Sequence, residues 1–197
     1  MDKLVIDIET KNTFADVGGQ ANIEALETSF VGVYSYKDDK YYSFFEDNFA
    51  ELGRLLQKAG LIIGFSINRF DIPVMRKYFD PESPFYCGVN FNIHALERYD
   101  ILEEIEETQG FRVSLDLLAK TNLNTGKTSH GLEAIKFYKE NRLKELEDYC
   151  LNDVKITKDL YDLIKKQGHL LLPQKFSSEI IKAELKTREV FAPPTLF

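Results

Sequence analysis

The chain has 197 residues, of which 44% are hydrophobic and 13% are aromatic, and its formal net charge at pH 7 is -7. Its length and apolar content are sufficient for one full hydrophobic core, and they exclude a disordered or fibrous protein. The negative charge argues against a protein that binds nucleic acid through a broad basic surface, but not against an enzyme whose acids surround metal ions. No stretch is apolar for long enough to span a bilayer, and no leader precedes the first strand, so we expect a cytoplasmic protein without a membrane partner.

The first predicted element is a strand over residues 3–10 that ends in two acids. Side chains alternate between the two faces of a strand, so Asp7 and Glu9 share a face and lie about 6 to 7 Å apart along it. Two carboxylates this close repel each other in partly buried surroundings, and a divalent cation is the usual remedy. The alternative is that both acids face water where the strand meets a loop.

A hairpin and a buried strand are predicted to extend this sheet. Residues 29–36 and 40–45 are β-branched and aromatic runs with a polar turn between them, which indicates an antiparallel hairpin. Residues 61–65 form a continuous apolar run, typical of a strand that is covered on both faces. A last strand is expected within 92–99. Together these elements predict an α/β fold with a mixed sheet and helices on its faces.

Helices are predicted where apolar residues recur at a spacing of three and four. One helix of about a dozen residues begins at Phe49 and stops at Gly60, and a short helical turn is expected at 21–26. Ser114 is a natural N-cap, and the acids of 101–107 are expected to face water. The remaining helices are expected over 71–79, 101–107, 114–119, 131–141 and 143–166.

Asp71 and Asp153 are two further acids for which a plain surface role is not the only interpretation. Asp71 follows the buried strand and precedes Ile72 and Pro73, so it is either the N-cap of a short helix or part of a site. Tyr149 and Asp153 are four residues apart on the longest predicted helix, which makes them neighbours on one face. Asp153 also belongs to the apolar stripe of that helix, where an unpaired charge is costly.

Three segments resemble, in order and context, the three motifs of the DEDDy superfamily of 3′-to-5′ exonucleases. They are Asp7-Ile8-Glu9-Thr10, the segment 64–75 and Tyr149-Cys150-Leu151-Asn152-Asp153. Within that superfamily, the chain is most similar to the proofreading domain of family B DNA polymerases and to related stand-alone exonucleases. The resemblance covers residues 1–167. It implies an RNase H-like three-layer fold with a mixed five-stranded sheet and helices on both faces.

The resemblance, carried over position by position, implies four metal-binding carboxylates and a tyrosine that orients the attacking water. The carboxylates are Asp7, Glu9, Asp71 and Asp153, and the tyrosine is Tyr149. Two ions, Mg²⁺ or Mn²⁺, are implied, and Asp7 is shared between them. Glu9 and Asp153 complete the site of the ion that carries the water. Asp71 acts through water on the second ion.

The resemblance also indicates residues that contact the substrate. They are Thr10, Phe65, Ser66, Asn68 and Phe70. The two phenylalanines, together with Phe14, are candidates for stacking on the terminal base, and core packing is an equal alternative for each. The superfamily often has Asn five positions before the second-motif acid, where this chain has Ser66, with Asn68 close by but out of register. This departure leaves the contacts to the substrate end open, but not the metal ligands.

Other residues with catalytic or metal-binding chemistry are assigned ordinary roles. The sister branch of the superfamily carries a histidine five residues before the last acid, where this chain has Asp148, so the histidines are expected at the surface or in loops. They are His94, His130 and His169. Cys87 and Cys150 fit neither a disulfide framework nor a zinc site, so packing roles are expected. The segment 125–128 resembles the end of a P-loop, but no strand precedes it, and we expect an exposed loop.

The sequence therefore predicts a metal-dependent 3′-to-5′ exonuclease that releases nucleoside 5′-monophosphates from single-stranded nucleic acid, with DNA favoured. The alternatives are an exoribonuclease with the same site, a non-catalytic nucleic-acid-binding module and an RNase H-like endonuclease. Whether a polymerase or a helicase is a partner, as in DNA proofreading or repair, stays open. We expect an exonuclease domain over 1–168 and a C-terminal extension over 169–197. The extension is expected to be a solvated, weakly ordered end, with a nucleic-acid arm as the alternative.

Overall fold

A five-stranded sheet forms the centre of the computed structural model, which describes residues 1–125, 131–173 and 179–188. Its strand order is β3-β2-β1-β4-β5. The strands are β1 (Asp2–Thr10), β2 (Thr28–Ser35), β3 (Lys40–Phe44), β4 (Ala59–Gly64) and β5 (Arg98–Asp100). β2 pairs antiparallel with β1 and β3, whereas β4 pairs parallel with β1 and β5. The mixed five-stranded sheet confirms the predicted fold class.

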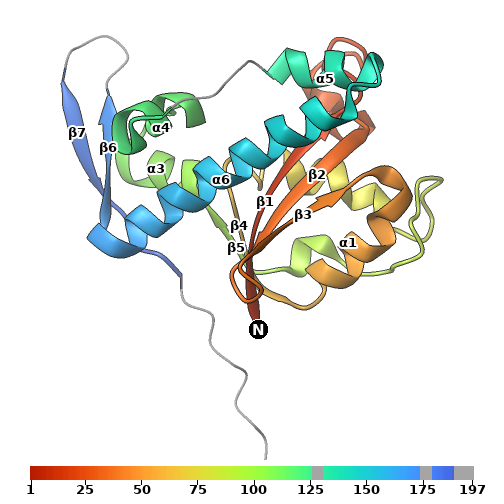
Figure 1. The fold of residues 1–197 in the computed structure, drawn as a ribbon, viewed down its shortest axis with the longest axis horizontal. Coiled ribbons are helices and arrows are strands. Elements are labelled where there is room, and N and C mark those ends of the chain that lie inside the picture. Colours follow the sequence, from red (N-terminus) through yellow and green to blue (C-terminus); the bar gives the residue numbers. More distant parts are fainter. Residues whose placement is uncertain (126–130, 174–178, 189–197) are drawn as a thin grey trace, which may run out of the picture.

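Helices cover both faces of the sheet (Figure 1). On one face α6 (Leu143–Gln167) crosses the strands, and its Val154 and Leu160 belong to the same buried cluster as Val5 and Ile63. α3 (Ile101–Gln109) and α4 (Leu115–Leu123) add to this cluster, and α5 (Gly131–Lys139) contacts α6. Because β1 alternates its side chains, Val5 and the acids after it point toward the α6 side.

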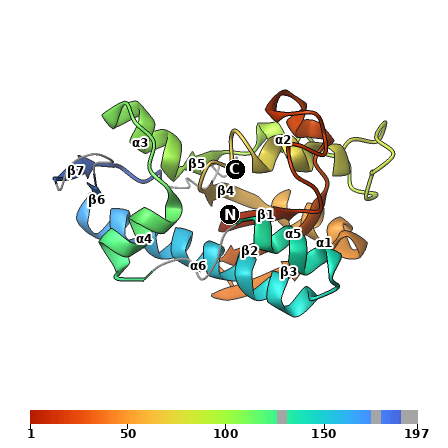
Figure 2. The same cartoon turned by 90° about the horizontal axis from the view of Figure 1, so that it is seen from above.

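The opposite face packs against α1 (Phe49–Leu56) and α2 (Asp71–Met75). Leu4, Ile6 and Ile62 project into this second cluster and are almost completely buried. Figure 2 shows α2 and α6 on opposite sides of β1 and β4. Short 3₁₀ turns complete this side of the chain: η1 (Gln20–Ala25), η2 (Glu46–Asn48), η3 (Arg76–Tyr78) and η4 (Ile93–Ala95). The two-sided burial explains why the runs that form β1 and β4 are so apolar.

Residues 169–173 and 179–188 differ from the expected solvated end, and the rest of that predicted extension lies outside the described residues. β6 (His169–Pro173) and β7 (Ile180–Glu184) pair antiparallel as a second, two-stranded sheet beside α3 and α4 (Figure 1). Alternate residues of this hairpin enter the main core, and Leu170, Leu172 and Ala183 are fully buried. Burial of these side chains supplies the apolar free energy that fixes the hairpin. The division of the chain at residue 168 stays a prediction.

Two of the predicted elements have different bounds in the structure. The first helix ends at Leu56, because Ala59 pairs with Asp2 and the chain, Gly60 included, already belongs to β4. The strand expected within 92–99 is only β5, because the Asn92 side chain accepts a hydrogen bond from the His94 backbone N–H and directs the chain into η4.

Within the described residues, no helix has both the length and the apolar character that a membrane span requires.

The acidic helix α3 is not simply a solvated face, as the sequence led us to expect. Glu106 lies 2.6 Å from Arg69 and 3.3 Å from Arg112, and Glu104 lies 3.3 Å from Arg188. These glutamates are only partly exposed. The helix therefore connects, through its acids, the loop before α2 to the segment after β7.

Candidate active site

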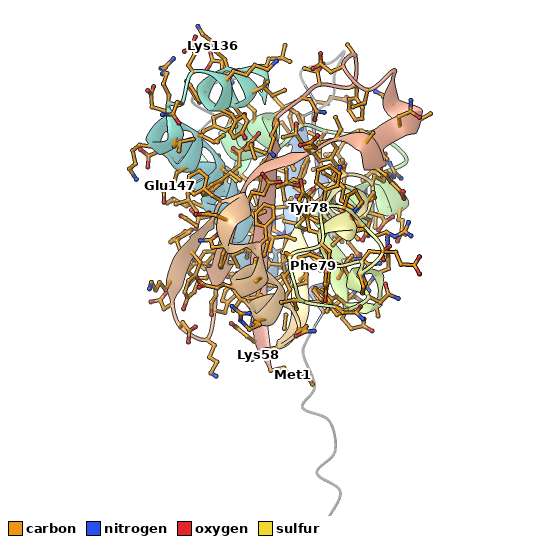
Figure 3. All side chains as sticks on the ribbon, turned by 90° about the vertical axis from the view of Figure 1, so that its right-hand side faces the viewer. Met1, Lys58, Tyr78, Phe79, Lys136 and Glu147 are labelled. Carbon is orange, nitrogen blue, oxygen red and sulfur yellow. The ribbon has the colours of Figure 1, made fainter. Side chains whose placement is uncertain are left out.

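A cavity of about 520 Å³ lies where the end of β1, the loop after β4 and α6 meet. Its lining includes all five residues to which the resemblance assigns catalysis, and these come from three separate segments: Asp7, Glu9, Asp71, Tyr149 and Asp153. Leu132 of α5 also lines it. Figure 3 shows Lys136 of α5 at the end of the view opposite to Met1. Because Glu9 and Thr10, the last residues of β1, line the cavity, it lies at the end of this strand that is remote from the N-terminus.

β1 supplies two carboxylates from the same face, as the alternation in the sequence predicts. Glu9 is 9% exposed and Asp7 is partly exposed. Asp7, Glu9 and Cys150 of α6 each offer a possible ligand atom, and these three atoms all lie within 4.8 Å of one another. The alternative, in which both acids simply face water, does not describe this arrangement, because both line a cavity beneath two helices.

α6 brings Tyr149 and Asp153 to the same cavity, and both side chains are almost fully buried, at 5% and 3% exposure. The approach of α6 to the sheet depends on Gly32 in β2, which pairs with Asp7. A Cβ atom on Gly32 would lie 2.9 Å from Val154 Cγ2. The missing side chain therefore lets the helix lie directly against the strand pair that carries Asp7.

Burial, followed by the charges of Asp153 and Glu9, raises the pKa of Tyr149 well above that of an ordinary tyrosine. The phenol therefore stays protonated at neutral pH. A protonated phenol beside carboxylates is able both to donate and to accept a hydrogen bond. Such a group is suited to orienting a water molecule, rather than to acting as an anion.

Asp71 reaches the cavity because the chain turns sharply after β4. A Cβ atom on Gly64 would lie 1.9 Å from Ile67 Cγ2, so this turn has room only for glycine. Asp71 is 3% exposed and is the first residue of α2, so the N-cap position belongs to Phe70, which argues against the N-cap alternative. Burial, and then the charges of Asp7 and Asp100, raise the pKa of Asp71 far above its ordinary value.

Asp100 holds the loop between β4 and α2, a role that the sequence analysis missed. Its buried carboxylate accepts hydrogen bonds from the backbone N–H groups of Ser66 (2.8 Å) and Asn68 (3.0 Å). The same carboxylate caps α3 by accepting from Leu102 and Glu103. The only feature of the sequence that could have indicated this role is the position of Asp100, an acid between a predicted strand and a predicted helix. A single side chain thus joins the start of α3 to the loop that positions Asp71.

The structure brings four of the five predicted substrate contacts to the cavity wall and leaves one outside it. Thr10, Phe65, Ser66 and Phe70 line the cavity. Asn68 instead donates to Glu103 and accepts from Arg98 Nε at 2.6 Å, so its side chain belongs to the α3 network. Ser66 has φ 69°, a left-handed conformation in which Asn is enriched, so the superfamily's usual Asn suits this kind of backbone.

Other residues of the cavity wall carried no signal in the sequence. Asn12 and Thr13 come from the loop after β1, and Leu132 and Ile135 come from α5. The loop also contributes Phe14, which the sequence analysis named as a candidate for base stacking and whose ring meets that of Phe70 edge to face at 6.0 Å. The cavity therefore has an acidic floor and a largely apolar, aromatic rim.

The residues to which ordinary roles were assigned lie mostly away from this cavity. His94 is exposed and His169 is partly exposed, and neither lines it. His130 and most of the segment 125–128 lie outside the described residues. Cys87 and Cys150 are both free thiols. Cys150 differs from the expectation of simple packing, because its sulfur contacts Asp7.

Comparisons with known proteins agree with this fold. The family model of the RNase_H superfamily matches residues 4–165. A search among curated proteins found no match. The family B DNA polymerase from the hyperthermophilic archaeon Pyrobaculum calidifontis is similar over 84% of this chain and 24% of its own, with 16% identity and a TM-score of 0.60.

Exonuclease I has a similar structure as well. One structure of it matches over 84% of this chain and 41% of its own, with 15% identity and a TM-score of 0.54. A zinc-bound structure of E. coli ExoI with single-stranded DNA gives the same coverage and identity and a TM-score of 0.53. The chain thus spans less than half the length of either protein, and at these identities the likeness concerns the fold. Because the family model covers the sheet and α6, the chain belongs to the RNase H superfamily.

Proposed function

We propose that the chain is a 3′-to-5′ exonuclease that hydrolyses the terminal phosphodiester bond of single-stranded nucleic acid, with DNA favoured. The observation that carries the proposal is the convergence of four carboxylates and one phenol, from three segments, on one cavity of this fold. The fold's similarity to E. coli ExoI, which is described in complex with single-stranded DNA, supports the choice of substrate. The cavity volume, about 520 Å³, lies within the range of about 300–1,000 Å³ that is typical of ligand pockets.

The acidic floor of the cavity fits divalent cations, and we propose that it holds two of them, Mg²⁺ or Mn²⁺. Hard carboxylate oxygens are the ligands that these cations prefer, and four are available here: Asp7, Glu9, Asp71 and Asp153. Asp71 Oδ1 supports the fit, because it is buried and has no hydrogen-bond partner among the described residues. A buried acceptor of this kind is costly until a ligand satisfies it. When bound, the cations supply positive charge to the scissile phosphate and lower the pKa of the attacking water.

The remaining residues of the cavity would bind and orient the substrate. Tyr149, kept neutral by its buried and acidic surroundings, would hydrogen-bond the attacking water. Phe14 and Phe70 offer ring faces and edges to an unpaired base, and Leu132, 72% exposed on α5, offers an apolar contact across the cavity. A base that is paired within a duplex cannot present its faces to such a wall, which is the reason for proposing single strands.

The proposal is tested with oligonucleotides labelled at the 5′ end, as DNA and as RNA, in single-stranded and duplex form. With Mg²⁺ or Mn²⁺ we expect a ladder of products that shortens from the 3′ end of single-stranded DNA, and no products with a chelator. Covalently closed single-stranded circles should stay intact. Faster digestion of RNA would identify an exoribonuclease, and cleaved circles would identify an endonuclease. No hydrolysis of any substrate, with measurable binding, would contradict the proposal in favour of a binding module.

Replacing Tyr149 with phenylalanine removes one hydroxyl from the cavity and leaves the ring in place. We expect Tyr149→Phe to slow single-turnover hydrolysis by about tenfold to a hundredfold, because the water loses its orienting hydrogen bond. The matched control is Tyr138→Phe on α5, a partly buried tyrosine that does not line the cavity. Equal rates for Tyr149→Phe and the wild type would return Tyr149 to a packing role.

A further inference from the structure

Cys150 is a buried thiol in contact with the central acid of the cavity. Its Sγ lies 3.3 Å from the backbone oxygen of Asp7 and 3.4 Å from Asp7 Oδ2. Cys150 itself is 0% exposed. The backbone oxygen of Asp7 and its ionised carboxylate oxygen Oδ2 can only accept hydrogen bonds. The S–H group is therefore the donor in this contact.

The sulfur contacts Asp7 on the side that faces away from the cavity. Tyr149 and Asp153, its neighbours on α6, line the cavity together with Asp7, whereas Cys150 is absent from the described lining. The thiol therefore contacts Asp7 from the side of the helix and sheet, away from the space that a substrate enters. This placement suits a group that orients the Asp7 carboxylate.

The position of the sulfur is built into the sheet register. Asp7 of β1 pairs with Gly32 of β2, and a Cβ atom on Gly32 would lie 3.2 Å from Cys150 Sγ. The sulfur thus fills the space that the glycine leaves beside the Asp7 backbone. Figure 1 shows α6 crossing over β1 and β2, and it contacts both strands. One residue of the helix is thereby fixed against the strand that carries the acids.

We propose that Cys150 is a positioning residue, whose S–H group fixes the Asp7 carboxylate in the orientation that binds divalent cations. The proposal rests on the proposed function of the cavity. Groups that hydrogen-bond a metal-binding carboxylate commonly alter metal affinity by an order of magnitude or more. A thiol is a weak donor, so a smaller effect is expected here.

The test is the affinity for Mn²⁺, measured on the full chain from the electron paramagnetic resonance of free Mn²⁺, without nucleic acid. We expect Cys150→Ala and Cys150→Val to raise the dissociation constant by about threefold to tenfold. Cys150→Ser, which keeps a donor of similar size, should recover most of the affinity. Cys87→Ser is the control for loss of a thiol elsewhere, and its affinity should equal that of the wild type. Thermal unfolding identifies any variant that fails to fold. Because alanine and valine differ in size, the affinity can still be measured on one of these two variants if the other does not fold.

Three outcomes would overturn the proposal. Unchanged Mn²⁺ affinity in both Cys150→Ala and Cys150→Val would show that the thiol does not hold Asp7. A Cys150→Ser variant as weak as Cys150→Ala would assign the effect to packing. A thiolate-to-metal absorption band on addition of Cd²⁺, lost in Cys150→Ser, would make the sulfur a ligand instead. A wild-type protein that binds Mn²⁺ but hydrolyses no oligonucleotide would contradict the proposed function alone, since the affinities of the variants would still decide the role of Cys150.

Discussion

Asp7→Asn and Asp153→Asn are each expected to lower the rate of 3′-end hydrolysis by at least about a thousandfold. Each change keeps the shape of the side chain and removes one negative charge from the floor of the cavity. Cations held by the remaining carboxylates would be bound more weakly and in altered positions, so both substrate binding and the hydrolytic step would suffer. Single-turnover digestion of 5′-labelled single-stranded DNA at saturating Mn²⁺ measures the loss.

The same substitutions are expected to raise the melting temperature of the metal-free protein. Asp153 is 3% exposed and lies in one cavity with Asp7 and Glu9, so removing a charge relieves repulsion between buried carboxylates. The increase in melting temperature that Mn²⁺ produces should shrink in parallel. Asp148→Asn is the matched control, because Asp148 is on the same helix but exposed and paired with Lys144 at 2.8 Å. A wild-type rate in Asp7→Asn would exclude a catalytic site at this cavity.

The sequence predicted those parts of the site in which a local pattern places an acid at a position where an apolar residue is expected. The alternation of β1 places Asp7 and Glu9 on one face, and the apolar stripe of α6 contains Asp153. Each position sets an acid where burial is expected, and the structure buries Glu9 and Asp153 almost completely. The resemblance to the exonuclease motifs then grouped the three segments, which no local pattern could have done.

The parts that the sequence did not reveal are contacts between distant residues whose types are individually ordinary. The Cys150 sulfur meets Asp7 across 143 positions, and Asp100 binds the Ser66 backbone across 34. Cysteine is often buried for packing alone, and an acid before a helix is most often only a cap. The C-terminal hairpin was missed for a related reason. Its alternating residues Leu170 and Leu172 are few, and they gain their stability from a core that the preceding chain builds.

The close approach of α6 to β2 leads to the second large expected effect, in Gly32→Ala. The added Cβ atom would lie 2.9 Å from Val154 Cγ2, 3.1 Å from Leu151 Cδ2 and 3.2 Å from Cys150 Sγ. All three atoms are on side chains of α6, and because Val154 and Cys150 are fully buried, we expect the helix to move away from the sheet. We expect the free energy of unfolding to fall by about 1–3 kcal/mol, measured by urea denaturation. We also expect the hydrolytic rate of the folded protein to fall by about tenfold to a hundredfold, because Tyr149 and Asp153 would move relative to Asp7.

Gly53→Ala separates these two effects. Gly53 is on α1, on the opposite face of the sheet, and a Cβ atom there would lie 3.0 Å from Phe79 Cε1 and 3.0 Å from Val89 Cβ. The crowding is similar, and alanine's better helix propensity offsets part of its cost. Gly53→Ala should therefore change stability but leave the rate of the folded protein at its wild-type value. If Gly32→Ala lost stability while keeping the full hydrolytic rate, the distance between α6 and β1 would not be what sets the geometry of the acids.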